Sequence, residues 1–113
     1  MYPAEFVGTF VFILLILCIT SIEDLNKFQI AFAIGLSLTI SILLTNGLNE
    51  NAKAHLNPAV TTAFIINGTL HIQNFFILIL LQFSAALLAV GVFKLFRSKS
   101  RPEDFTNITK KIL

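Results

Sequence analysis

Three long apolar segments constrain the fold of this chain more than any other feature. A helix needs about 20 mainly apolar residues to cross the hydrocarbon core of a bilayer, within a range of about 17 to 25. The three segments are "AEFVGTFVFILLILCITSI", "FQIAFAIGLSLTISILLT" and "FFILILLQFSAALLAVGVF". They predict an all-α membrane protein with three transmembrane helices at about residues 4–22, 28–45 and 75–96.

The composition supports lipid as the solvent of this chain. Its 113 residues are 56% hydrophobic and only 12% charged, against about 25% charged in average soluble domains. A net charge of +2 is too small to indicate a nucleic-acid partner. The sequence lacks a nucleophile next to a base, a carboxylate pair and a phosphate loop, so neither an enzyme nor a cofactor is expected. His55 and His71 have no Cys or carboxylate at ligand spacing, so no metal site is expected.

The links between the apolar segments predict how the spans are connected. The first segment lacks a basic start and carries Glu5 early, so we expect a span rather than a cleaved signal peptide. Residues 23–27 form a short link that makes the first two spans an antiparallel hairpin. Residues 46–57 are polar and contain Asn-Gly, which is typical of a loop. Residues 97–113 are expected to form a polar, basic tail.

A fourth apolar segment, "PAVTTAFII" at residues 58–66, is too short to cross a membrane. With its cap it has about ten residues, which gives a helix of roughly 15 Å, half the hydrocarbon thickness. Asn57 is a good N-cap, Pro58 suits the first helical position and Gly68 suits the C-terminal end. A half-length helix is therefore predicted at about residues 57–67. Composition leaves two interpretations open: a helix lying on the membrane surface, or a re-entrant helix that reaches mid-membrane.

Four motifs resemble the aquaporin and glycerol-facilitator family, the major intrinsic proteins. "AHLNPAVT" at residues 54–61 is similar to the family's first signature loop. "AEFVGTF", "AFAIGLSL" and "LLQFSAALLA" resemble its first three helices in the same order. The resemblance covers about residues 3–96 and favours the re-entrant interpretation. It implies that residues 1–96 form the equivalent of one aquaporin repeat.

The resemblance also implies roles for individual residues. Asn57, Pro58, Ala59 and His55 would line or shape a pore, and Ile34 matches the family's filter position on the second helix. The backbone carbonyls of residues 53–56 would supply hydrogen-bond acceptors along the pathway. The implied scaffold residues are Glu5, Thr9, Gly35 and Gln82.

The sequence departs from the family pattern in ways that bear on function. The family fold contains two inverted repeats and two signature motifs, whereas these 113 residues contain one motif. Val60 stands where a following arginine would be, so the family's aromatic-arginine filter cannot be assembled from this sequence alone. We therefore expect passive transport of water or small neutral solutes only after repeats associate, as a homo-oligomer or with a complementary half-channel. The alternative is a non-conducting membrane subunit that associates with a full-length or complementary channel.

Two arguments conflict over the orientation of the chain in the membrane. Lys94, Arg97, Lys99 and Arg101 follow the third span, and only Lys53 and the N-terminal amine lie on the opposite side. Basic residues near span ends favour the cytoplasm, which predicts a cytoplasmic C-terminus. The family's first repeat has the reverse orientation, so the orientation stays open at this stage.

Overall fold

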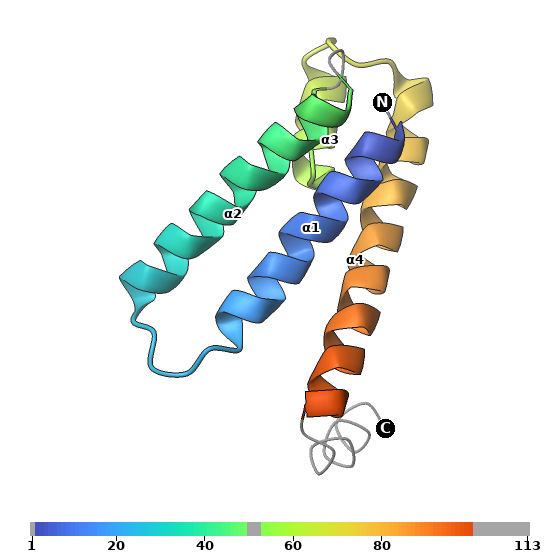
Figure 1. The fold of residues 1–113 in the computed structure, drawn as a ribbon. Coiled ribbons are helices and arrows are strands. Elements are labelled where there is room, and N and C mark those ends of the chain that lie inside the picture. The colour runs from blue at the N-terminus through green and yellow to red at the C-terminus, as the bar shows by residue number, and fades with distance from the viewer. Residues whose placement is uncertain (1, 50–52, 101–113) are drawn as a thin grey trace.

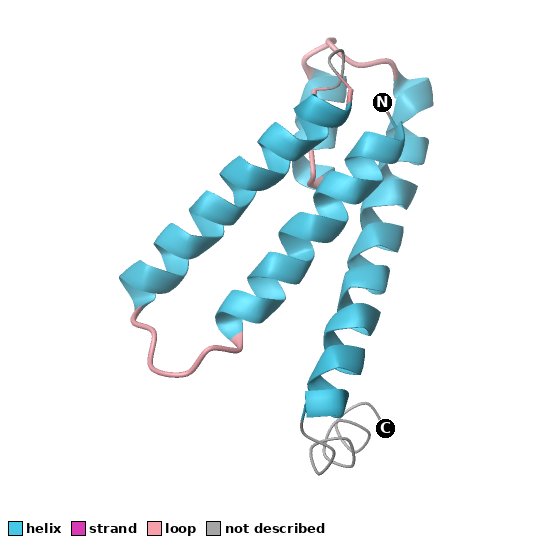
Figure 2. Ribbon diagram, in the orientation of Figure 1, coloured by secondary structure: helices cyan, strands magenta, loops and turns pink. Residues whose placement is uncertain are grey.

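The computed structural model describes residues 2–49 and 53–100, which form four α-helices joined by short loops (Figures 1 and 2). The helices are α1 (Tyr2–Thr20), α2 (Lys27–Leu48), α3 (Pro58–Ile66) and α4 (Ile72–Ser100). Three of them, α1, α2 and α4, are long and apolar enough to cross a membrane. The predicted fold class is confirmed.

The three long helices form one open layer, with α1 between α2 and α4 (Figure 1). α1 contacts both α2 and α4, and within the described residues α2 does not contact α4. α1 and α2 form the expected antiparallel hairpin. The N-terminus, the end of α2 and the start of α4 therefore lie at one end of the bundle, and the C-terminal end of α4 lies at the other (Figure 1).

The loop before α3 enters the bundle, and the short helix α3 returns to the same end (Figure 1). Residues 53–57 lead toward the middle of the molecule, where the chain turns and returns as α3 to the level where α4 begins (Figure 1). Its nine residues rise only about 14 Å. Its first turn contacts Gln82, which lies ten residues, or about 15 Å, from the start of α4 at Ile72. This depth is about half of a hydrocarbon core, so α3 is re-entrant.

Local sequence signals account for the start of α2 and for both ends of α3. The Asn26 side chain accepts from the Gln29 backbone N–H, and the Gln29 side chain accepts from the Asn26 N–H, which completes a capping box at the start of α2. Asn57 caps α3 and Pro58 occupies its first turn, as predicted. Gly68 ends α3 with φ +83°, a conformation that glycine adopts without steric cost.

Several helix ends differ from the sequence-based expectation: α1 ends at Thr20 rather than at 22, α4 begins at Ile72 rather than at 75, and α2 and α4 both extend past their predicted ends. α2 continues through Asn46 and Gly47 to Leu48, although this pair was expected to start a loop. Both residues are exposed in the last turn of the helix, where Asn and Gly are common, and the Asn49 N–H still donates to the Thr45 carbonyl. α4 continues to Ser100, which is four residues into the stretch assigned to the tail. The remaining residues of that tail, 101–113, lie outside the described part of the chain.

The interior of this bundle is small and polar. The buried apolar residues include three alanines, Ala4, Ala85 and Ala89. The buried polar residues are more numerous and comprise Glu5, Thr9, Ser37, Ser41, Thr45, His55, Thr61 and Gln82. Large apolar side chains such as Phe32, Phe76 and Leu87 face outward. This inverted distribution is expected when lipid surrounds the protein, because apolar burial gives little driving force between helices there.

Candidate functional site

A buried carboxyl group on α1 holds the loop that precedes α3. The Glu5 side chain is only 2% exposed. It accepts hydrogen bonds from the backbone N–H groups of His55 at 3.2 Å and Leu56 at 2.5 Å. It also accepts from Gln82 Nε2 on α4 at 3.0 Å. One side chain thus joins α1, the loop and α4, and it satisfies two buried backbone donors that lie outside any helix.

The loop conformation that makes this possible is centred on Leu56. Leu56 has φ +60°, the left-handed region, which costs a non-glycine residue roughly 1 to 2 kcal/mol. This conformation turns two successive N–H groups toward Glu5 and lets the next residue, Asn57, start a helix. The Leu56 side chain is 3% exposed, so its burial offsets the backbone cost. Strained backbone of this kind is concentrated at functional sites.

Thr61, on α3, contacts both the preceding loop and α4. Its side chain is completely buried. Its Oγ1 accepts a hydrogen bond from Gln82 Nε2 at 2.8 Å. It also forms a hydrogen bond with His55 Nδ1 at 3.0 Å, whose direction depends on the tautomer of the histidine. Because Gln82 also donates to Glu5, the first turn of α3 is tied to α1 through a continuous set of polar contacts.

His55 positions the loop against α3 rather than facing open space. Its ring stacks on Phe64 with parallel planes and a centroid distance of 4.8 Å. His55 lies outside the three spanning helices. Burial lowers the pKa of its imidazole below the usual value, and the nearby Glu5 carboxyl offsets part of that effect. The neutral ring has one N–H donor and one bare nitrogen, which fits a hydrogen bond with the Thr61 hydroxyl in either direction.

Asn57 presents its amide group at the exposed tip of α3. Its Oδ1 accepts from the Ala59 N–H at 2.8 Å, so the oxygen is used for capping. Its Nδ2 has no hydrogen-bond partner among the described residues, and the side chain is exposed. The two amide N–H groups are therefore available as donors beside the positive end of a helix dipole. Pro58 is half-buried and Ala59 is exposed next to it.

A comparison with known protein families identifies the family of this chain. The family described as Major intrinsic protein matches residues 1–113. The chain belongs to the major intrinsic protein family. It is an integral, multi-pass membrane protein, with three helices able to span a bilayer.

Two curated relatives show how much of such a protein the chain represents. It is 32% identical over 102 residues to "Aquaporin-3" of Milnesium tardigradum, covering 79% of this chain and 30% of that protein. It is 34% identical over 97 residues to "Glycerol uptake facilitator protein-like 6" of Lactiplantibacillus plantarum, covering 86% of this chain and 44% of that protein. The chain therefore spans less than half the length of these relatives. No solved structure gives a significant match.

The remaining predicted residues take no part in the hydrogen bonds of Glu5. Thr9 is 2% exposed beside the site, and its hydroxyl has no partner among the described residues. Ile34 is half-buried on α2, eleven residues or about 16 Å along the helix from Thr45, which lies beside Gly8 as Leu56 of the loop does. Ile34 thus lies at a different depth from Asn57. Its assignment to a filter stays a prediction.

The resemblance implied Gly35 as a scaffold residue, but no other helix packs closely against it within the described residues. A Cβ built there would meet no atom within 4 Å. The close approach occurs at Gly8 instead, where a Cβ would lie 1.8 Å from Thr45 Oγ1 and 2.9 Å from Leu56 Cδ2. Sequence reasoning missed Gly8 and the central position of Thr61. The signals were present, since Gly8 interrupts an apolar helix and Thr61 lies four residues after Asn57, one helical turn along the same face.

Proposed function

We propose that this repeat forms one half of an aquaporin-type pathway that conducts water or small neutral solutes. The observation that carries the proposal is the Asn57 side chain. Its oxygen is held by the Ala59 N–H, and its two N–H donors point away from the cap at the exposed tip of a re-entrant helix. A donor at this depth would bind a water molecule or hydroxyl group in passing.

The electrostatics around Asn57 favour neutral solutes over cations. The N-terminal end of α3 contributes partial positive charge through the helix dipole, although Pro58 has no N–H and the Ala59 N–H is already bonded to the Asn57 oxygen. Within the described residues, no backbone N–H donates to the carbonyls of residues 53–56, so these oxygens are available to a solute moving along the loop. A pathway lined by donors, acceptors and a positive dipole end orients water and opposes the entry of protons and cations.

The proposal requires a second repeat. Asn57, Ala59 and Val60 are exposed on the described repeat, so the tip of α3 is open on one side. A second repeat with its own half-helix would cover this side. It could come from another copy of this chain or from a complementary repeat of another polypeptide. The printed names of the relatives, an aquaporin and a glycerol uptake facilitator, support water or a small polyol as solute.

The test is osmotic shrinkage of vesicles that contain the purified chain, alone and with a complementary repeat. Asn57→Asp keeps an oxygen that can cap α3 but replaces the exposed donors with a negative charge. We expect the variant to insert normally and to change water permeability or admit cations. Thr62→Val is the matched control, because Thr62 is exposed and its hydroxyl donates only to the Pro58 carbonyl. Normal permeability and cation exclusion in Asn57→Asp would refute a pathway at Asn57.

A non-conducting subunit is the second candidate, and the open side of α3 is the observation that favours it. A partner that covers this surface without bringing a half-helix would leave no pathway. In that case vesicles would gain no permeability with any complementary repeat, although the chain would still co-purify with its partner channel.

A further inference from the structure

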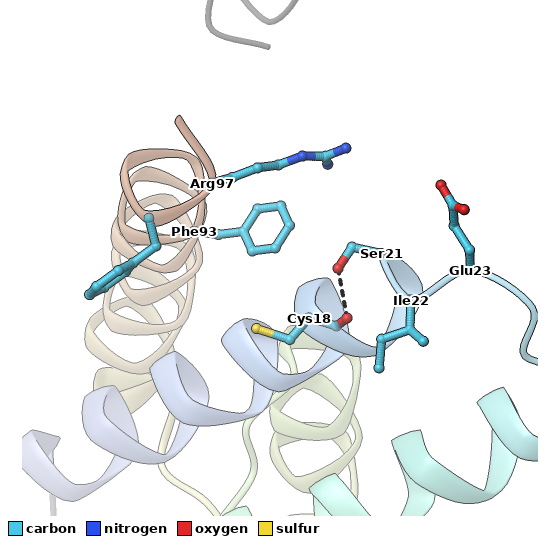
Figure 3. A pocket seen from close by; sticks show the side chains of 7 residues that line it. Cys18, Ser21, Ile22, Glu23, Phe93 and Arg97 are labelled. Atoms are coloured by element: carbon cyan, nitrogen blue, oxygen red, sulfur yellow. Dashed lines mark hydrogen bonds between the residues drawn. The ribbon is translucent and has the colours of Figure 1, made fainter. Parts of the chain in front are cut away.

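A pocket at the end of the bundle opposite α3 contains two opposite charges that do not pair with each other. It is a cavity of about 490 Å³ between the C-terminal ends of α1 and α4. Cys18, Ser21 and Glu23 line it from the first helix and its turn, and Phe93, Phe96 and Arg97 line it from α4 (Figure 3). We propose that this pocket binds the headgroup of a zwitterionic phospholipid that carries a primary ammonium group, the ethanolamine class.

The depth of the pocket matches that of a lipid headgroup. Glu23 follows the apolar stretch of α1, which is long enough to span a membrane and ends at Thr20, and Arg97 stands among the basic residues that follow the apolar run of α4. Glu23 and Arg97 therefore lie where the hydrocarbon core gives way to the polar interface. The apolar rings of Phe93 and Phe96 lie on the wall below them along α4. A pocket with apolar walls and a charged mouth at this level suits a molecule that has the same distribution of polarity.

The cationic side of the pocket fits a phosphate group. The Arg97 guanidinium carbon lies 5.9 Å from the centroid of the Phe93 ring, so the ring restricts where the guanidinium can move. Arg97 extends across the mouth of the pocket toward the side where Glu23 stands (Figure 3). Guanidinium binds phosphate oxygens through paired donors in a fixed geometry. Lys94 lies one turn before Arg97 and adds a second positive charge near this end of α4.

The anionic side of the pocket fits an ammonium group. Glu23 is exposed and forms no ion pair among the described residues. The Ser21 hydroxyl donates to the Cys18 carbonyl at 2.8 Å, so its oxygen is left to accept (Figure 3). A carboxylate and a hydroxyl oxygen together would accept hydrogen bonds from an ammonium with N–H groups. A choline headgroup has no N–H donor, and a glycerol headgroup has no positive charge, so both lack this half of the recognition.

The chain offers a reporter for this site in Cys18, its single cysteine, which is exposed in the pocket wall. The experiment measures how fast an uncharged maleimide modifies Cys18 in the full chain, reconstituted in three kinds of vesicle. These are phosphatidylcholine alone, and phosphatidylcholine mixed with phosphatidylethanolamine or with phosphatidylglycerol. We expect modification to be slower by about threefold or more with phosphatidylethanolamine, the range of a partly exposed charge pair.

Two variants and a control separate the parts of the proposal. Arg97→Gln should abolish the protection, and Glu23→Gln should make phosphatidylethanolamine equivalent to phosphatidylcholine. Lys27→Gln removes a charge at the same end of the bundle without touching the pocket and should change nothing. Equal rates in all vesicles, or protection that persists in both pocket variants, would overturn the proposal. Stronger protection by phosphatidylglycerol would also overturn it, because the site would then recognise an anion alone. None of these outcomes depends on whether the chain conducts.

Discussion

Replacing Gly8 with alanine tests whether close helix packing positions the site. The added Cβ would lie 1.8 Å from Thr45 Oγ1, whereas ordinary contact begins at 3.4 Å, so the groups must separate by 3.4 minus 1.8, or 1.6 Å. Thr45 is fully buried and its hydroxyl donates to the Ser41 carbonyl at 2.8 Å, which opposes rotation of its side chain. The second close atom belongs to Leu56, the residue whose N–H binds Glu5. The strain would therefore reach the loop.

The expected cost follows from overpacking. Extra methyl groups in well-packed interiors cost typically about 1 to 3 kcal/mol. In water, alanine would recover roughly 0.5 to 1 kcal/mol through helix propensity. In a bilayer the separated helices remain helical, because their backbone groups must stay paired, so this gain is small. We expect Gly8→Ala to lower the free energy of unfolding by about 1 to 3 kcal/mol.

The assay unfolds the detergent-solubilised chain with sodium dodecyl sulfate. Circular dichroism follows the loss of helix packing and of helical structure. Gly35→Ala is the matched control, because a Cβ at Gly35 meets no atom within 4 Å, and it should change stability by less than about 0.5 kcal/mol. Gly8→Ala combined with Thr45→Ala removes the closest atom, so the double variant should cost less than the sum of the two single variants. Equal effects of Gly8→Ala and Gly35→Ala would refute the argument.

Three further substitutions probe the polar contacts and the orientation. Thr61→Val leaves Gln82 Nε2 and the His55 ring short of a partner and should cost about 1 to 3 kcal/mol in the same unfolding assay, against less than about 0.5 kcal/mol for Thr62→Val. Glu5→Ala leaves three buried donors unpaired and should cost at least about 3 kcal/mol; an unchanged midpoint would show that the loop does not depend on it. In a Cys18→Ala background, Ser100→Cys should be labelled from one face of intact membranes only, because the basic residues after the third span bias insertion. Comparable labelling from both faces would contradict a single orientation.

Local signals in the sequence were enough to predict α3. Asn57, Pro58 and Gly68 mark its two ends through capping and backbone preferences that act within a few residues. The helix predicted at about residues 57–67 corresponds to α3 at Pro58–Ile66, with Asn57 and Asn67 as its two caps. The end of α2 was harder to predict, because an Asn-Gly pair fits both a loop and the last turn of a helix. Only the tertiary structure decides between them.

Contacts between distant residues could not be predicted from residue patterns alone. The bonds from His55 and Leu56 to Glu5 join residues 50 and 51 positions apart. Only the resemblance to the family brought Glu5 and Gln82 into the predicted scaffold, and it did not indicate that Thr61 links them. Nothing in a leucine side chain indicates the left-handed conformation of Leu56. The functional roles of Asn57 and its neighbours remain predictions.

The distribution of polar groups explains why the fold and the proposed site share the same residues. In lipid, leucine and phenylalanine gain little by facing another helix rather than an acyl chain, and many of them face outward here. What distinguishes the native arrangement is the set of buried donors and acceptors that would be unpaired in any other arrangement. Glu5, Thr61 and Gln82 provide that distinction at the depth where α3 begins. The Glu5 carboxyl group, Thr61 Oγ1 and Gln82 Nε2 are paired with one another or with the loop, whereas the Asn57 side chain is exposed and its N–H groups have no partner among the described residues. Substitutions at the first three should therefore reduce folded protein, whereas Asn57→Asp should change permeability while the fold persists.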